Sequence, residues 1–267
     1  MTPVAAATDT VWTTEDIRAA GSTLRVRKGG AGDPILVLPH DIGTLDRLPF
    51  YDALARRFTV YVPSHPGYDG SERPNWMRNV RDVAVTYQAL LATLNLTKVS
   101  LVGLGFGGWI AAEMATMSPH AFKRLVLVGA MGVKPVKGEI LDQAIVSYID
   151  YVRAGFEDQG VFDHLFGADP STEQLEQWDL NREMTFRIAW KPYMYNPTLP
   201  HLLAGARSPA LVVWGHGDKI VPIECGYAYE RALPGSRLAV VLMCGHFVDM
   251  EQPETLAKLI LEFAAEK

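Results

Sequence analysis

The chain has 267 residues, of which 48% are hydrophobic, 21% charged and 10% aromatic, and its 25 Lys and Arg against 30 Asp and Glu give a formal net charge of −5. This apolar content excludes a disordered protein, and the acidic balance argues against a protein that binds nucleic acid. The length fits one large α/β domain or two small ones, because single hydrophobic cores stop growing at about 250–300 residues.

Seven short apolar runs are predicted strands, and several are apolar at every position, as in strands that are buried on both faces of a parallel sheet. They cover residues 23–27, 35–38, 58–62, 99–102, 125–128, 211–214 and 238–242. Between these runs, apolar residues repeat at helical spacing, for example Val83, Tyr87 and Leu90. The alternation predicts an α/β protein with a mainly parallel, doubly wound sheet and right-handed crossovers.

Residues 134–206 interrupt this alternation, because they contain no strand-like run. Their pattern predicts helices over 141–151, 172–178 and 182–190. We interpret the segment as a helical cap, inserted into a core that is formed by residues 1–133 and 207–267 and belonging to the same domain. A surface elaboration without a role in function is the alternative. The aromatic residues of the cap either line an apolar pocket or pack the cap onto the sheet.

A glycine-rich turn follows the predicted strand at 99–102. Gly103, Gly105 and Gly108 match the dinucleotide fingerprint G-x-G-x-x-G, but the acid that this fingerprint requires about 20 residues later is missing. The same turn has the frame of a nucleophile elbow, G-x-S-x-G, in which a strained turn between strand and helix exposes a nucleophile. The middle position of that frame is Gly105, so the usual serine is absent.

Two polar residues downstream fit the elbow interpretation. Asp218 follows the predicted strand at 211–214, and His246 follows the last strand. An acid and then a histidine is the order in which the partners of such a nucleophile follow it, the carboxylate orienting the imidazole. Upstream, His40 and Asp41 follow the strand at 35–38, where an oxyanion loop is expected.

With these segments in place, the sequence resembles the α/β-hydrolase superfamily, in particular its capped branch of esterases, lactonases and carbon–carbon bond hydrolases, from about residue 21 to 263. The resemblance implies that Gly105 occupies the nucleophile position, with Asp218 as the acid and His246 as the base. It also implies that the backbone N–H groups of Phe106 and Ile42 are oxyanion donors. The segments that carry it are Pro66-Gly67-Tyr68, Gly107-Gly108-Trp109, Trp214-Gly-His-Gly-Asp218 with Val221-Pro222, and Gly245-His246 followed by Glu251-Gln-Pro253-Glu254.

The chain departs from this family at two further positions. Leu104 replaces the polar residue that usually precedes the nucleophile, and Asp41 replaces the glycine that usually follows the histidine of the oxyanion loop. A carboxylate beside the oxyanion hole would raise the barrier that the hole is meant to lower. The alternative is that Asp41 caps a turn or helix and points away from the site.

Three functions remain open. In the first, the protein is an enzyme that acts on a small, largely apolar carbonyl compound, such as an ester, a lactone or a carbon–carbon bond substrate, through the His246–Asp218 dyad and without a serine nucleophile. In the second, it is a catalytically silent binding protein. In the third, it is a serine hydrolase that carries an engineered Ser→Gly change. Because the elbow, the base and the acid are all expected to be in place, we predict that Gly105→Ser creates or restores acyl transfer.

The remaining expectations concern cofactors, partners and location. The two cysteines and seven histidines show no CxxC, HxxxH or HExxH spacing, so we expect no metal and no cofactor. Cys244 belongs to the end of an apolar strand and is predicted to be a buried thiol. We expect a small-molecule ligand, no nucleic acid and no membrane, and the oligomeric state stays open. Without a secretory signal at the amino terminus, the expected compartment is the cytoplasm.

Overall fold

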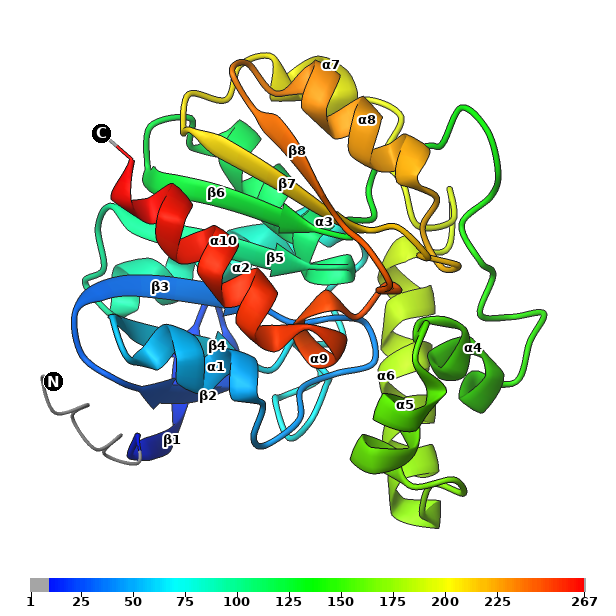
Figure 1. Ribbon diagram of the computed structural model, residues 1–267. Helices are drawn as coiled ribbons and strands as arrows, with labels where there is room; N and C mark the ends of the chain where they lie inside the picture. Colours follow the sequence, from blue (N-terminus) through cyan, green and yellow to red (C-terminus); the bar gives the residue numbers. More distant parts are fainter. Residues whose placement is uncertain (1–9, 267) are drawn as a thin grey trace, which may run out of the picture.

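The computed structural model describes residues 10–266, which form one sheet flanked by helices (Figure 1). The eight strands lie in the order β1-β2-β4-β3-β5-β6-β7-β8, with parallel pairing from β4 to β8 and antiparallel pairing of β2 with both β1 and β4. The predicted α/β class with a mainly parallel sheet is therefore confirmed. The bounds are β1 (Trp12–Ala19), β2 (Ser22–Gly29), β3 (Asp33–Leu38), β4 (Phe58–Pro63), β5 (Val99–Leu104), β6 (Phe122–Val128), β7 (Ala210–Gly215) and β8 (Arg237–Val241).

Strand β1 is absent from the sequence-based prediction. It lies at the edge of the sheet and pairs with β2 along its whole length. Five of its eight residues are exposed, so it lacks the apolar run by which the other strands are recognised. Its pairing with β2, rather than its own composition, makes this segment a strand.

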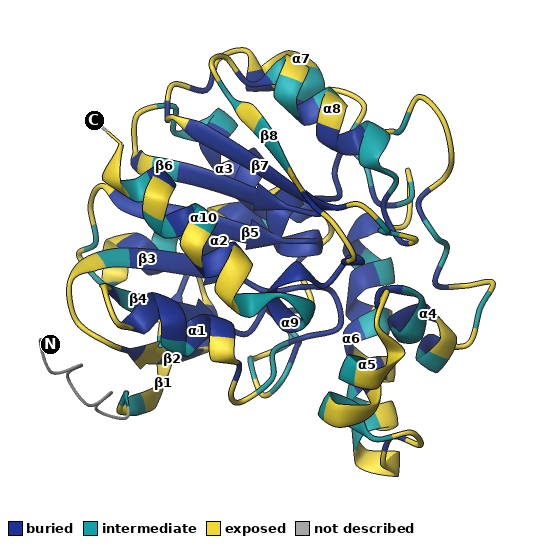
Figure 2. Ribbon diagram, in the orientation of Figure 1, coloured by how far each residue is buried: buried dark blue, intermediate teal, exposed yellow. Residues whose placement is uncertain are grey.

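Two layers of helices cover the sheet. In Figure 1, α10 and α1 lie in front of the strands and α2 and α3 lie behind them. The first layer contains α1 (Pro49–Ala55), α9 (Val248–Glu251) and α10 (Pro253–Ala265), and the second contains α2 (Val80–Thr93), α3 (Phe106–Met117), α7 (Leu199–Leu203) and α8 (Ile223–Ala232). Because both faces are covered, every residue of β5 and β7 is buried (Figure 2).

Three further helices follow β6 in the chain and precede β7. They lie beyond the carboxyl ends of the parallel strands (Figure 1). They are α4 (Tyr148–Ala154), α5 (Gln159–Phe166) and α6 (Thr172–Ala189). The two helices predicted over 172–178 and 182–190 form one continuous helix. The helix predicted over 141–151 begins only at Tyr148, because Ser147 caps it by accepting a hydrogen bond from the backbone N–H of Asp150. The boundaries of the cap at 134 and 206 stay predictions.

Among the residues that the structure describes, no helix combines the length and the apolar character that a bilayer crossing requires.

Candidate active site

The turn between β5 and α3 is the sharpest feature of the site. Gly105 has φ +50° and ψ −111°, a left-handed conformation that strains any residue with a side chain. Its backbone N–H donates to the Val128 carbonyl at 2.8 Å, and its own carbonyl accepts from Met131 at 3.1 Å. At Gly107, a Cβ would collide with the Leu38 carbonyl, so only glycine allows α3 to start this close to β3.

Asp218 lies beside His246, as the sequence predicted. Nδ1 of His246 lies 2.8 Å from Oδ2 of Asp218, and both side chains are fully buried. The other oxygen of this carboxylate accepts from the backbone N–H groups of Ile220 at 2.9 Å and Val221 at 2.8 Å. The loop after β7 thus fixes the carboxylate, which in turn fixes the imidazole. We call these two residues the His246–Asp218 pair.

A second pair of the same kind was not predicted. Nε2 of His40, in the loop after β3, lies 2.8 Å from Oδ1 of Asp249 on α9, and both side chains are 1% exposed. The two imidazole centroids are 5.2 Å apart, at an interplanar angle of 60°. Asp249 follows His246 by three residues, and this short spacing was the only signal in the sequence. We call these residues the His40–Asp249 pair.

Both pairs face the turn at Gly105. A Cβ placed on this glycine would lie 2.5 Å from Nδ1 of His40 and 2.8 Å from Nε2 of His246. Within residues 10–266, neither of these ring nitrogens has a hydrogen-bond partner. The spacing disagrees with the expectation that Gly105→Ser restores a nucleophile, because His40 stands where the serine side chain would begin.

Asp41 points into the site, so its interpretation as a cap directed away from the site is wrong. Its side chain is fully buried, and its Oδ2 accepts a hydrogen bond from the Tyr151 hydroxyl at 2.8 Å and another from the Gln143 side-chain amide. A carboxylate oxygen of Asp41 and one ring nitrogen each of His40 and His246 lie within 4.8 Å of one another. Tyr151 and Gln143, which hold this carboxylate from the cap, were also missed.

Two opposing effects set the pKa of His246. Burial by itself lowers the pKa, because it disfavours the charged ring. The Asp218 carboxylate raises it through its charge and its hydrogen bond, and the charges of Asp41 and Asp249 add to this effect. The sum leaves the pKa of His246 above its ordinary value, so the site favours positive charge.

The two predicted oxyanion donors belong to two segments, the start of α3 and the loop after β3. Phe106 is the first residue of α3, and its ring packs edge-on against His65 at a centroid distance of 5.6 Å. Ile42 is buried in the turn after β3, and its carbonyl accepts from the Asn181 side chain at 3.2 Å. The backbone N–H of Gly107 donates to the Pro39 carbonyl at 3.0 Å and ties the two segments together. The role of Phe106 and Ile42 as oxyanion donors stays a prediction.

Two other buried side chains have structural roles. His65 is buried between the Tyr87 hydroxyl at 2.6 Å and the Pro39 carbonyl at 2.9 Å, and burial lowers the pKa of its imidazole to about 4. Cys244 is buried as predicted, and burial raises the pKa of its thiol. Near neutral pH, the Cys244 thiol is therefore not a thiolate nucleophile. The His65 ring stays neutral, and both of its nitrogens are hydrogen-bonded.

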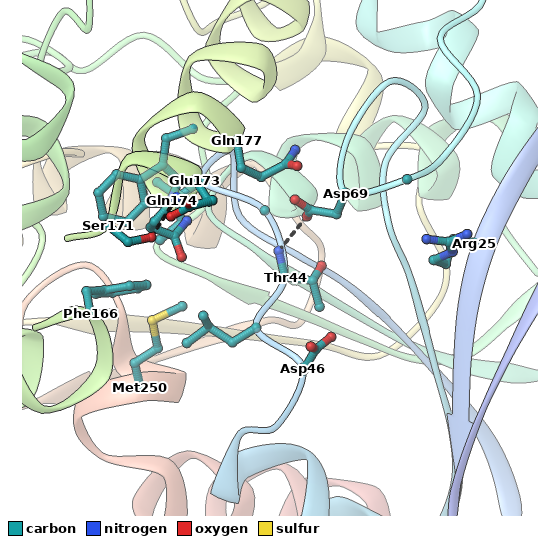
Figure 3. A pocket seen from close by; sticks show the side chains of 15 residues that line it. Arg25, Thr44, Asp46, Asp69, Phe166, Ser171, Glu173, Gln174, Gln177 and Met250 are labelled. Atoms are coloured by element: carbon teal, nitrogen blue, oxygen red, sulfur yellow. Dashed lines mark hydrogen bonds between the residues drawn. The ribbon is translucent and has the colours of Figure 1, made fainter.

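A cavity of about 590 Å³ lies beside the buried site, between the loop after β3 and helix α6 (Figure 3). Asp69 is in its wall, and its Oδ2 accepts from the backbone N–H of Thr44 at 2.8 Å. The residues that line it are Arg25, Ile42, Gly43, Thr44, Leu45, Asp46, Asp69, Gly70, Phe166, Ser171, Glu173, Gln174, Gln177, Trp178 and Met250. Gly105, His40 and His246 are not among them, whereas Ile42, which follows Asp41 in the chain, is.

The fold and this arrangement of residues agree with the sequence comparisons. The profile of the Alpha/beta hydrolase family matches residues 35–259. The chain therefore belongs to the α/β-hydrolase family, as its resemblance implied.

Two bacterial enzymes are similar to nearly the whole chain. The 2-hydroxy-6-oxononadienedioate/2-hydroxy-6-oxononatrienedioate hydrolase of Paraburkholderia phymatum is 27% identical, over 96% of this chain and 99% of its own length. The 2-hydroxy-6-oxo-2,4-heptadienoate hydrolase of Pseudomonas putida is also 27% identical, over 93% of this chain and 95% of its own. A solved meta-cleavage product hydrolase from Pseudomonas fluorescens has the same fold, with a TM-score of 0.75, 20% identity, and coverage of 93% of this chain and 96% of that one.

Proposed function

We propose that this protein is an enzyme that hydrolyses a bond next to the carbonyl group of a small, largely apolar compound, with water in place of a serine hydroxyl as the nucleophile. Two similar proteins are named as hydrolases of 2-hydroxy-6-oxo acids, and the similarity extends over almost the entire chain. A 2-hydroxy-6-oxo dienoic acid is therefore the first substrate class to test. The cytoplasm, expected from the sequence, is part of this proposal.

The observation that carries the proposal is the convergence of two His–Asp pairs on one point above Gly105. The free ring nitrogens of His40 and His246 lie on the side of the turn from which a serine side chain would project. Without that side chain, a water molecule held by the two imidazoles can approach a carbonyl carbon. The carboxylates of Asp218 and Asp249 hold the two rings in place.

The proposed reaction balances with water as the only co-reactant. The water oxygen forms a bond to the carbonyl carbon, and the bond from that carbon to the leaving carbon or oxygen breaks. The leaving atom keeps the electron pair of the broken bond and takes up one proton, so the two hydrogens of water end on the acid product and on the leaving group. The backbone N–H groups of Phe106 and Ile42 are the proposed donors to the developing oxyanion.

Turnover of 2-hydroxy-6-oxo-2,4-heptadienoate, followed by the loss of its absorbance, tests this function. We expect turnover by the unmodified protein and a loss of at least ~10²-fold in kcat/KM for His246→Ala, with unchanged circular dichroism. His201→Ala is the matched control, because this histidine is exposed on α7, and we expect it to retain full activity. A folded protein that turns over neither this acid nor short acyl esters would contradict the proposal.

A catalytically silent binding protein is the second candidate, and the separation of the cavity from the buried site favours it. The cavity of about 590 Å³ can hold a small ligand, yet Gly105, His40 and His246 do not line it. A ligand bound there would contact Asp69 and Trp178 rather than the two imidazoles. Ligand binding that survives His246→Ala, without any turnover, would support this second function.

A further inference from the structure

The carboxylate behind each imidazole fixes its tautomer. Because a carboxylate only accepts hydrogen bonds, Nδ1–H of His246 donates to Asp218, and Nε2–H of His40 donates to Asp249. In the neutral rings, Nε2 of His246 and Nδ1 of His40 therefore carry lone pairs. Both lone pairs face the turn at Gly105.

Asp41 adds a third acceptor to the same place. Tyr151 and Gln143 donate to its Oδ2, whereas its Oδ1 has no hydrogen-bond partner in the part of the chain that the structure describes. This carboxylate and the two imidazoles come within 4.8 Å of one another, and all three side chains are at most 1% exposed. Among the described residues these three buried acceptors face no donor, which is unfavourable, and a cation bound between them would offset this cost.

We propose that His40, Asp41 and His246 bind a divalent transition-metal ion above Gly105. Two neutral imidazoles and one carboxylate form a donor set that suits Zn²⁺, Fe²⁺, Co²⁺ and Mn²⁺, and three protein ligands leave positions open for water or substrate. The two pairs also supply the outer contacts of such a site, because a histidine that binds a metal usually donates its other N–H to a carboxylate or carbonyl.

The geometry at Gly105 agrees with this assignment. Ligands in cis positions on a metal with bonds of about 2.1 Å lie about 3–3.5 Å apart, so small side-chain rotations bring atoms within 4.8 Å of one another to binding distance. A Cβ at position 105 would lie 2.5 Å from one ring nitrogen and 2.8 Å from the other, and would fill the space between them. Glycine alone leaves this space free of a side chain.

A metal ion also accounts for Asp41, which is unfavourable in a metal-free hydrolase. The cation offsets the carboxylate charge beside the developing oxyanion, and it lowers the pKa of a bound water so that hydroxide forms near neutral pH. This use of the ion rests on the proposed function, whereas binding of the ion does not. The local spacing of the histidines did not reveal the cluster, because His246 lies far along the chain from His40 and Asp41.

Equilibrium dialysis of the untagged, EDTA-treated protein against Zn²⁺ tests the proposal, with bound metal measured by mass spectrometry. We expect about one Zn²⁺ per chain, and an affinity that is lower by ~10²-fold or more in His40→Ala, His246→Ala and Asp41→Asn. Asp249→Asn, which perturbs the ligand only through its partner, should lose ~10–100-fold. The control His201→Ala should bind as the unmodified protein does. Absence of Zn²⁺ binding, or equal binding by all variants, would overturn the proposal.

X-ray absorption of the unmodified Co²⁺-loaded protein provides a readout that does not depend on how the variants fold. We expect the multiple-scattering pattern of two imidazoles with light-atom ligands, and a spectrum with no imidazole would overturn the site. The test separates the two proposals. Turnover by a protein that binds no metal would overturn this inference and leave the proposed function standing, whereas metal binding without any turnover would leave the inference standing and contradict the function.

Discussion

At position 105 the backbone is left-handed, and two neighbouring imidazoles leave no room for a side chain. The φ of +50° penalises any side chain, and a Cβ would have to displace two imidazoles that carboxylates hold in place. The glycine is therefore matched to the positions of His40 and His246. Because residue 105 supplies no reactive group, the chemistry of the proposed reaction depends on what the two rings bind.

We predict that Gly105→Ser lowers stability and does not by itself create a serine hydrolase. The strained φ and the contact with His40 should cost ~1–3 kcal/mol in the free energy of unfolding, measured by urea denaturation. We expect no labelling by a fluorophosphonate in this variant. Combining it with His40→Asn, which shortens the side chain and keeps a donor for Asp249, should permit labelling. Rapid labelling of the single variant would show that His40 moves aside freely.

His65 gives the stability of the protein a defined pH dependence. Burial lowers the pKa of its imidazole from 6.5 to about 4 in the folded state. Between these values the unfolded chain binds a proton that the folded chain does not, so the contribution to stability is full above pH 6.5 and is lost as the pH falls toward 4. The loss amounts to ~3 kcal/mol for this one group.

Urea unfolding between pH 7 and pH 4 checks this contribution. The free energy of unfolding should fall less steeply with acid in His65→Gln than in the unmodified protein, because the variant has no group that titrates at this position. The matched control is His120→Gln, since this histidine is exposed. Parallel pH profiles for His65→Gln and the unmodified protein would show that His65 does not set this dependence.

Sequence reasoning identified Asp218 and His246 because each follows an apolar run that predicts a strand, although of these two strands only β7 is buried throughout. It did not identify Asp249, whose carboxylate lies on the short helix α9, or the two cap residues that hold Asp41. These contacts depend on how the cap and the loop after β3 fold over the turn. Such pairings between distant segments leave no local spacing in the sequence.

At the scale of elements, the strands were predictable where they are buried on both faces. β5 and β7 are apolar and buried throughout, whereas β1 is an exposed edge strand whose polar sequence gives no such signal. The helices of the cap were less predictable. In α6, Asp179 and Asn181 interrupt the apolar pattern on either side of Leu180, yet Asn181 is buried and the helix continues through these residues.

The hydrogen bond from α4 to the loop after β3 allows a test at this scale. Tyr151→Phe removes the hydroxyl that donates to buried Asp41 at 2.8 Å, and we predict a loss of ~1–3 kcal/mol in the free energy of unfolding. Thermal and urea unfolding of the variant measure this loss. Tyr227→Phe, at a tyrosine that is 42% exposed, should change stability by less than ~0.5 kcal/mol. Equal stability of the two variants would mean that this contact does not hold the cap to the core.

At the scale of the whole molecule, the sheet brings together residues from three distant parts of the chain. The loop after β3 supplies His40 and Asp41, the turn after β5 supplies Gly105, and the segment after β8 supplies His246 (Figure 1). Parallel strands end at the same edge of a sheet, which explains why the order of motifs in the sequence was enough to predict this convergence. The complete burial of the site was not predictable, because it depends on how the cap packs.

A double-mutant cycle on kcat/KM for 2-hydroxy-6-oxo-2,4-heptadienoate tests the central claim most directly, namely that the His246–Asp218 and His40–Asp249 pairs act on the same water. We predict that His246→Ala and His40→Ala each lower kcat/KM by at least ~10²-fold. The double variant should have the same kcat/KM as the less active single variant, since either change already removes the shared function. Losses that multiply in the double variant, or full activity in His40→Ala, would contradict the claim.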